Sequence, residues 1–209
     1  MNIHRIYGLF LPFFRRRRKR LFHKIMHPRA EDGILDVGGY HWFWNSMECS
    51  SFITCCNLDI PSCFYDTTRF AYVRGDGRRL LFKDKEFDIA FSNSVIEHVG
   101  SFADQRLFAD EIRRVGKSYW VQTPHKWFFV EPHLVALFIH YFPRRLQRRL
   151  IRYFTAWGLA TKPSQDQVDE FLNSTRLLTE AEAKSLFPDG TIYREKFLFF
   201  TKSFVVYKR

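Results

Sequence analysis

The chain has 209 residues, a length that suits one domain with a sizeable core, and its 46% hydrophobic and 18% aromatic content favours a folded protein over a disordered one. No run of about 18 uncharged apolar residues occurs, so we expect no transmembrane helix. The net charge is +11, but nine of the lysines and arginines, and no acid, lie in residues 1–30. We therefore expect a basic N-terminal arm over residues 1–30 and one folded domain over residues 31–209.

The arm joins an apolar segment, residues 6–14, to a basic run, residues 15–20. A secretory signal carries its charges before its apolar segment, whereas these charges follow it. The order is typical of a segment that lies on an anionic membrane surface, while a solvated arm without function and a nucleic-acid-binding arm stay open. The four cysteines match no zinc pattern and indicate free thiols. We expect a cytoplasmic protein that the arm can hold as a peripheral protein at the inner face of the membrane.

From residue 34 onward, apolar segments of strand length alternate with segments of helix length. The predicted strands are residues 34–37, 52–58, 70–73, 87–92 and 119–122, followed by a terminal antiparallel pair at 196–200 and 204–207. The predicted helices are residues 42–49, 102–115 and 179–187. Thr179 and Glu182 form a capping-box pattern at the start of the last helix. This alternation predicts an α/β protein whose mostly parallel sheet is covered by helices on both faces.

Residues 131–178 interrupt the alternation. Leu146, Leu150 and Phe154 recur at four-residue intervals with arginines beside them, which predicts an amphipathic helix with one apolar face. We expect a helical insertion that covers the acceptor side of the site described next.

An apolar strand ends at Asp36 and is followed by Gly38 and Gly39, and 23 positions after Asp36 a second strand ends at Asp59. The glycines let the backbone approach a ligand closely, and the distal acid can accept both ribose hydroxyls. The layout is therefore typical of a nucleoside-binding half-fold.

The glycine turn differs from dinucleotide and P-loop sites. Bulky rings at Tyr40 and Trp42 stand where a dinucleotide site has its third glycine, and no Gly-Lys-Ser/Thr follows. A nucleoside without phosphates fits better, and S-adenosylmethionine is the commonest cofactor of that kind. We consider the aromatic run at residues 40–44 more consistent with core packing than with base stacking.

Further polar groups follow the next predicted strands. Asp76 and Gly77 can reach an adenine amino group, and Ser92 and Asn93 can reach the amino-acid tail and the sulfonium. All lie at carboxyl ends of strands, where ligands bind in open α/β sheets. The predicted cofactor residues are Asp36, Gly38, Gly39, Asp59, Asp76, Gly77, Ser92 and Asn93.

Four segments in this order, residues 34–39, 57–60, 75–80 and 87–99, resemble the motifs of class I S-adenosylmethionine-dependent methyltransferases. They are similar in particular to the bacterial small-molecule, methyltransferase type 11-like branch, and the resemblance covers about residues 31–209. It implies a Rossmann-like, seven-stranded, mostly parallel sheet with strand 7 antiparallel and an insertion between strands 5 and 6. Tyr40 and Trp42 depart from the glycine-rich loop of the family.

Methyl transfer is an in-line displacement, so the enzyme holds donor and acceptor about 3–3.5 Å apart and removes a proton if the acceptor is a hydroxyl or an amine. His98, His125 and His133 are the candidate bases, since imidazole titrates near neutral pH. Packing roles for these histidines stay open. We expect no metal site, because no third ligand is evident beside Glu131 and His133.

Three functions remain after these observations. The first is methyl transfer to a small-molecule or lipid-linked acceptor, with the arm at an anionic membrane surface. The second is an RNA or protein methyltransferase whose arm binds phosphates, ranked lower because Ser92–Val95 stand where base methyltransferases carry Asn/Asp-Pro-Pro-Tyr/Phe. The third is a non-catalytic binding or scaffold protein with the same fold.

Overall fold

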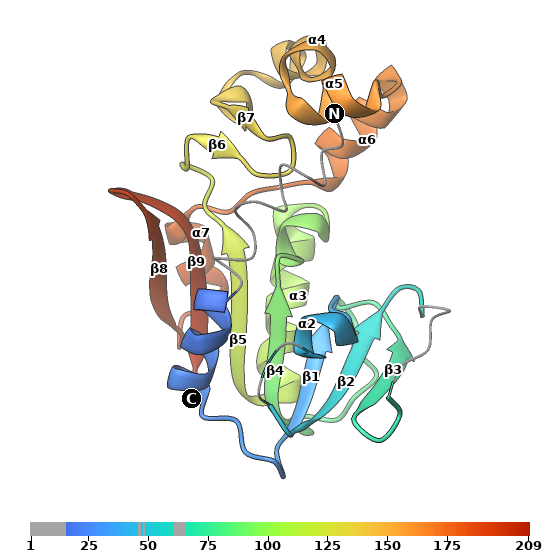
Figure 1. Ribbon diagram of the computed structural model, residues 1–209, viewed down its shortest axis with the longest axis vertical. Helices are drawn as coiled ribbons and strands as arrows, with labels where there is room; N and C mark the ends of the chain where they lie inside the picture. Colours follow the sequence, from blue (N-terminus) through green and yellow to red (C-terminus); the bar gives the residue numbers. More distant parts are fainter. Residues whose placement is uncertain (1–15, 46, 48, 61–65) are drawn as a thin grey trace.

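The computed structural model describes residues 16–45, 47, 49–60 and 66–209. Seven strands form one sheet in the order β3-β2-β1-β4-β5-β9-β8 (Figure 1). Strands β1 to β5 are parallel, and β9 is antiparallel to both β5 and β8. The predicted α/β, Rossmann-like fold is confirmed. The strands are β1 (Gly33–Val37), β2 (Phe52–Asn57), β3 (Phe70–Arg74), β4 (Phe87–Asn93), β5 (Gly116–Pro124), β8 (Thr191–Phe197) and β9 (Phe200–Lys208).

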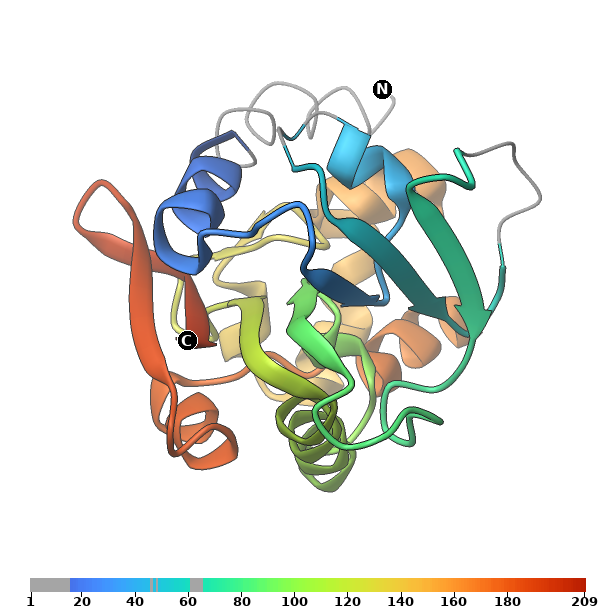
Figure 2. The ribbon, with the colours of Figure 1, turned by 90° about the horizontal axis from the view of Figure 1, so that it is seen from below.

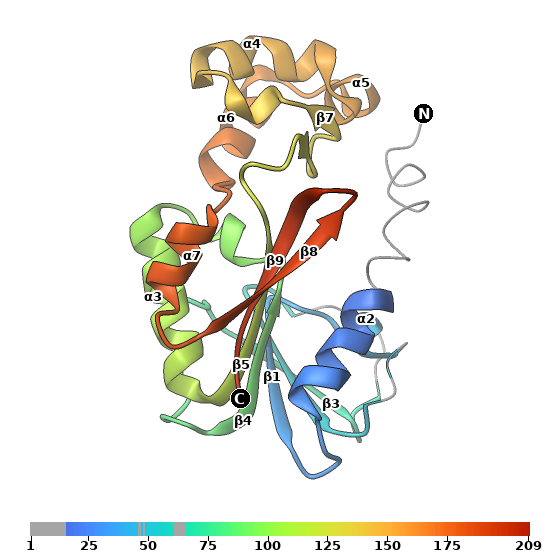
Figure 3. The ribbon, with the colours of Figure 1, turned by 90° about the vertical axis from the view of Figure 1, so that its left-hand side faces the viewer.

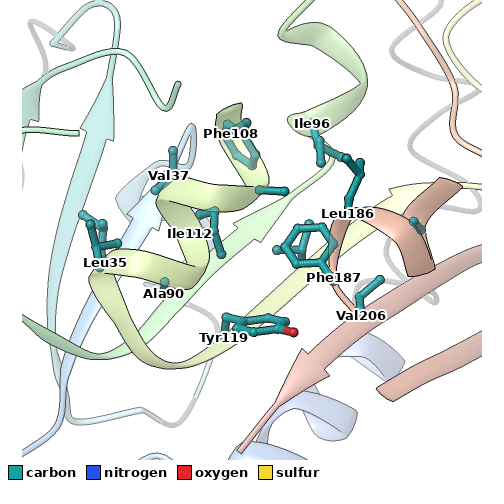
Figure 4. Close-up of a cluster of buried hydrophobic side chains, with 14 of the residues drawn as sticks. Leu35, Val37, Ala90, Ile96, Phe108, Ile112, Tyr119, Leu186, Phe187 and Val206 are labelled. Atoms are coloured by element: carbon teal, nitrogen blue, oxygen red, sulfur yellow. The ribbon is translucent and has the colours of Figure 1, made fainter. Parts of the chain in front are cut away.

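Helices cover both faces of the sheet, as Figures 2 and 3 show. Helices α3 (Phe102–Val115) and α7 (Glu180–Leu186) lie on one face, and α2 (His41–Asn45) lies on the other with a helix over residues 16–26. The α3 face holds a cluster of fully buried side chains, among them Phe108, Ile112 and Phe187 (Figure 4). The carboxyl ends of β1, β2 and β4 are thereby fixed at one edge of the sheet.

The helix over residues 16–26 corrects the prediction of an arm outside the fold. Phe22 is 1% exposed, and its ring meets Trp44, Phe91 and Trp120 edge-on at centroid distances of 5.3–5.7 Å. Burial of a large ring couples this basic segment to the core. The prediction failed because the arginines near Phe22 give the segment the composition of an exposed basic arm, although one side of the helix is apolar. The apolar segment predicted at 6–14 lies outside the described residues.

The insertion is a small layer with its own core, and Figure 1 shows it above the carboxyl ends of β4 and β5. Its elements are β6 (Val130–Glu131), β7 (Ala136–Leu137), the 3-10 helix η2 (Ile139–Tyr141), α4 (Arg144–Phe154), α5 (Ala156–Thr161) and α6 (Gln165–Ser174). The predicted amphipathic helix is present as α4, but its fully buried residue is Ile151, whereas Leu146 and Phe154 are exposed. Those two side chains therefore face solvent instead of the core.

The terminal hairpin was predicted with its turn in the wrong place. The sequence indicated a strand at 196–200, but β8 ends at Phe197 and the turn is Leu198-Phe199. Leu198 has φ +53°, and Phe199 is 94% exposed. An apolar turn has the composition of a strand, so the pattern alone placed the strand too late.

No helix among the described residues has the length and apolar character needed to cross a bilayer. Cys49, Cys55 and Cys56 are buried free thiols, as predicted. Cys63 lies outside the described residues.

The predicted capping box of α7 is present. Thr179 Oγ1 accepts from Glu182 N at 3.2 Å, and Glu182 Oε2 accepts from Thr179 N at 2.8 Å. Thr179→Ala is expected to lower the free energy of unfolding by about 1 kcal/mol, since an N-cap contributes about that much. Urea unfolding measures the loss. Ser185→Ala in the same helix is the control, and equal midpoints for the two variants would refute a capping role.

Candidate functional site

The turn after β1 is held closely against β2. Gly38 has φ +81° and donates its N–H to Cys56 O at 2.8 Å. Asn57 Nδ2 donates to Gly39 O at 2.7 Å. A Cβ at Gly39 would lie 1.9 Å from Asp36 Oδ2, so no larger residue fits there. The predicted role of both glycines, a close approach of bare backbone, agrees with this geometry.

Asp36 lies beneath that turn and is 1% exposed. Trp44 Nε1 donates to its Oδ2 at 2.6 Å, whereas Oδ1 has no hydrogen-bond partner within the described part of the chain. Burial raises the pKa of Asp36 to about 7, against the effect of the Trp44 bond. A buried carboxylate oxygen beside bare backbone fits a ligand that brings a polar hydrogen, as the amino and hydroxyl groups of S-adenosylmethionine do.

The raised pKa of Asp36 predicts a pH-dependent stability. The pKa of an aspartate in the unfolded chain is near 3.9. Between about pH 4 and pH 7 the folded chain therefore keeps a proton on Asp36 that the unfolded chain has already released. The Asp36 contribution is complete below pH 4 and is lost as the pH rises through about 7. Asparagine does not titrate, so the stability of Asp36→Asn relative to wild type is expected to increase as the pH rises from about 4 to about 7. Urea midpoints from pH 4 to pH 8 measure it.

The exposed Asp84 provides the comparison for this pH series. Asp84→Asn makes the same chemical change at an exposed position, so its pH series controls for the substitution itself. A difference between wild type and Asp36→Asn that stays constant from pH 4 to pH 8 would contradict the protonated Asp36.

The two acids after β2 and β3 lie at the same edge of the sheet, but each has a protein partner. Asp59 is highly exposed and pairs with Arg74 Nη2 at 2.8 Å. Asp76 accepts from Arg78 through both oxygens, at 2.7 Å from Nη2. An exposed ion pair is weak, so Asp59 can exchange Arg74 for ribose hydroxyls. The Asp76 contact with adenine stays a prediction, and in this structure Asp76 orders its own turn.

Gly77 and Ser92 both pack closely against β1, beside the glycine turn. A Cβ at Gly77 would lie 2.6 Å from the Phe108 ring and 2.8 Å from Val37 Cγ1. Ser92 is fully buried and donates to Val37 O at 3.1 Å. Both residues thus hold β1 in place, and their predicted cofactor contacts are untested.

Asn93 is the last residue of β4 and contacts Arg18, which was predicted to lie in the N-terminal arm. Arg18 Nη1 donates to Asn93 Oδ1 at 2.7 Å, and Arg18 Nη2 donates to Glu195 Oε2 at 2.8 Å. Burial raises the pKa of Glu195, but the charge of Arg18 and its hydrogen bond outweigh burial and lower it. Arg18 therefore joins the N-terminal helix to β4 and β8 at the edge that carries the site.

The aromatic run after Gly39 divides into two parts. Trp44 is fully buried and packs on Phe22 and Phe91, as the packing interpretation predicted. Tyr40 and Trp42 instead stack on one another at 4.4 Å with their planes 6° apart, and Trp42 is 55% exposed. The place of the third family glycine is thus filled by an accessible pair of rings.

The structure brings two of the three predicted histidines together. His98, in the 3-10 helix η1 (Ile96–His98), lies 3.1 Å from His133 between the two Nε2 atoms. Burial and the neighbouring His133 lower the pKa of His98 to about 4. Burial also lowers the pKa of His133, but the Nδ1 contact with Glu131 Oε1 at 2.8 Å and the Glu131 charge outweigh it and raise the pKa. One ring therefore donates and the other accepts.

His125 lies apart from this pair. Its Nδ1 is 3.3 Å from Thr201 O, and burial lowers its pKa. A carbonyl can only accept, so Nδ1 donates and Nε2 is the basic nitrogen. This tautomer suits the base role predicted for His125.

A third metal-ligating group, Glu97, adjoins the histidine pair. Glu97 is fully buried, and ligand atoms of Glu97, His98 and His133 all lie within 4.8 Å of one another. From the sequence we predicted no metal site, because no third ligand was evident beside Glu131 and His133. Glu97 is next to His98 in the sequence, but its place near His133 depends on the insertion folding back onto η1.

A cavity of about 540 Å³ lies between the insertion and the start of α3. Glu131 and Thr175, which contact His133 and His98, both line it. Lys126, Arg144 and Arg176 give its wall an excess of positive charge. None of the predicted cofactor residues lines this cavity, so it is a separate space on the insertion side.

Comparison with known proteins supports the fold and the domain. Residues 40–119 match a family model described as "Methyltransferase domain". No curated protein matches the chain. The glycine turn itself lies just before the matched residues.

Similar solved structures cover nearly the whole chain at low identity, and they show the fold alone. A Rhodobacter sphaeroides protein named as a Zn-dependent alcohol dehydrogenase has a TM-score of 0.59 at 12% identity, covering 91% of this chain and 88% of its own. The Pyrococcus horikoshii protein PH0226 has a TM-score of 0.53 at 14% identity, covering 97% of both chains. An Aquifex aeolicus SAM-dependent methyltransferase has a TM-score of 0.51 at 11% identity, covering 90% and 87%.

The domain match and the sheet order agree with the motifs of the sequence. S-adenosylmethionine is the methyl donor that this family implies, and the glycine turn with Asp36 fits it. The chain therefore resembles the class I S-adenosylmethionine-dependent methyltransferases in its sheet order and, over residues 40–119, in the match to a methyltransferase domain.

Proposed function

We propose that the protein transfers a methyl group from S-adenosylmethionine to a small-molecule or lipid-linked acceptor, and that the acceptor is reached at a membrane surface. The cofactor supplies the methyl group when bound. Asp36, Gly38, Gly39 and Asp59 hold it, and the insertion with its cavity receives the acceptor. The general base stays a prediction among His98, His125 and His133.

One observation carries the lipid-linked class of acceptor: an exposed aromatic surface beside the insertion. We give this name to Trp127, Phe138, Tyr141, Phe199 and Phe200, all of which are exposed. Adjacent rings connect the loop after β5, the insertion and the β8–β9 hairpin. The contacts are Trp127–Tyr141 at 5.8 Å, Tyr141–Phe138 at 5.9 Å, Phe138–Phe129 at 6.3 Å and Phe129–Phe200 at 5.2 Å.

Large exposed apolar patches mark interaction sites, and charge identifies the partner here. The neighbouring α4 begins two residues after Phe142 and carries five exposed arginines and no acid, at positions 144, 145, 148, 149 and 152. Aromatic rings beside a basic helix suit the headgroup region of an anionic bilayer. The positive cavity wall agrees with an acceptor that carries an anionic group.

The acceptor class is tested by incubating the full chain with methyl-labelled S-adenosylmethionine and a bacterial lysate. The label is then counted in the organic extract, the water-soluble low-mass fraction, RNA and protein. We expect it in the lipid extract, and Asp59→Ala should reduce it. Label confined to RNA or protein would replace this proposal with the second function. Cofactor binding without any labelled product would favour the scaffold.

A further inference from the structure

The histidine pair at the sheet edge has the geometry of a metal site. His98 belongs to η1 after β4, and His133 belongs to the insertion, yet their Nε2 atoms lie 3.1 Å apart. Ligands held 2.0–2.1 Å from a tetrahedral ion lie about 3.3 Å from one another. The pair is therefore already spaced as two ligands of one ion, and a Glu97 oxygen lies no more than 4.8 Å from either.

Glu97 supplies the independent observation. Its carboxylate is fully buried, and Oε2 accepts from Thr123 Oγ1 at 2.9 Å. Oε1 has no hydrogen-bond partner in the parts of the chain that the structure describes. A hydrogen bond between the two imidazoles explains their contact but leaves this buried oxygen unsatisfied. A bound cation satisfies it.

The surrounding contacts orient the ligands as in known metal centres. Glu131 Oε1 lies 2.8 Å from His133 Nδ1, so the Nε2 of that ring is directed toward His98. Glu131 is itself buried and accepts from Leu134 N at 2.5 Å. Two imidazoles and a carboxylate, with a second carboxylate behind one imidazole, are the donors that Zn²⁺ prefers at sites with an open coordination position.

We infer that Glu97, His98 and His133 bind one divalent transition-metal ion of the zinc class, with Glu131 as the positioning residue for His133. The ion joins η1, at the carboxyl end of β4, to the insertion. It also adjoins the cavity that Glu131 and Thr175 line, so a cavity ligand can approach it. His98 and His133 are then ligands, and His125 is the remaining candidate base.

The test is metal binding by the full chain after chelator treatment and dialysis. Titration with Zn²⁺ by calorimetry and with Co²⁺ by visible absorption should each give one ion per chain. His98→Ala and His133→Ala are expected to weaken binding at least about 100-fold, and Glu131→Gln about 10- to 100-fold. His125→Ala is the matched histidine control and should bind as wild type does.

Glu97→Gln keeps the size of the side chain and serves if an alanine variant fails to fold, as judged by circular dichroism. It should weaken binding at least about 10-fold through loss of the carboxylate charge. A folded wild type that binds no ion would overturn the inference. So would one ion whose affinity is unchanged by His98→Ala and His133→Ala. Neither result bears on S-adenosylmethionine binding, so the proposed function is tested separately.

Discussion

Arg18→Ala is expected to lower the free energy of unfolding by about 3–5 kcal/mol, because it leaves Glu195 buried without its cation. Arg18 and Glu195 are both nearly inaccessible, and the guanidinium contacts the two carboxylate oxygens at 2.8–3.3 Å. Ser203 Oγ donates to the same carboxylate at 2.6 Å. Urea unfolding measures the loss.

Two further variants separate the charge effect from general damage to the helix. Arg17→Ala removes an exposed arginine from the same helix and should cost less than about 1 kcal/mol. Arg18→Leu combined with Glu195→Leu removes both charges and should recover much of the loss, since an apolar pair can replace a buried ion pair. A cost for Arg18→Ala no larger than that for Arg17→Ala would mean that residues 16–26 are not part of the domain.

Phe199→Asp is expected to weaken binding to anionic vesicles about 10- to 100-fold, since burying one phenylalanine contributes about 1.5–3 kcal/mol. Phe199 is the most exposed member of the aromatic surface and lies at the tip of the hairpin. A bilayer would bury its whole ring. Co-sedimentation of the full chain with phosphatidylglycerol-containing vesicles measures the binding.

Leu81→Asp is the matched control for vesicle binding. Leu81 is 83% exposed, so the change in charge and hydrophobicity is similar, but it lies between β3 and β4, outside the aromatic surface. Equal binding by both variants would refute docking through the aromatic surface. Binding that is negligible for wild type would refute the membrane part of the proposed function.

Features that depend only on residues close together in the chain could be predicted from the sequence. Gly38 needs its positive φ, and Thr179 and Glu182 cap each other across three residues, so both were predictable from the sequence. The order of strands and helices was predictable for the same reason. Each strand from β1 to β5 is an apolar segment bounded by turns or helices.

The remaining features depend on contacts between distant segments. Arg18 meets Glu195 across 177 positions, and His98 meets His133 across 35. Nothing near Arg18 in sequence distinguishes it from Arg17 or Arg20, because the three differ only in which side of the helix they occupy. Burial of one arginine in a basic run therefore needs the tertiary structure.

The α4 segment shows a different reason for error. Its four-residue apolar spacing predicts an amphipathic helix, and the helix is present. The spacing alone does not show whether the apolar side chains pack in the core or are exposed to solvent. Leu150 and Ile151 face the core of the insertion, and Leu146 and Phe154 remain exposed. The sequence does not distinguish an apolar residue that packs in the core from an apolar residue that is exposed for contact with a partner.

Calorimetric titration of S-adenosylmethionine and S-adenosylhomocysteine into the full chain tests the central claim most directly. Asp59→Ala is compared with Asp84→Ala, because both acids are exposed and each pairs with an arginine, Arg74 or Arg114. Neither change should unfold the protein. We predict one ligand per chain for wild type and Asp84→Ala, and binding at least about 10-fold weaker for Asp59→Ala through loss of the ribose hydrogen bonds. A folded wild type that binds neither compound, or equal binding by the two variants, would contradict the assigned cofactor site.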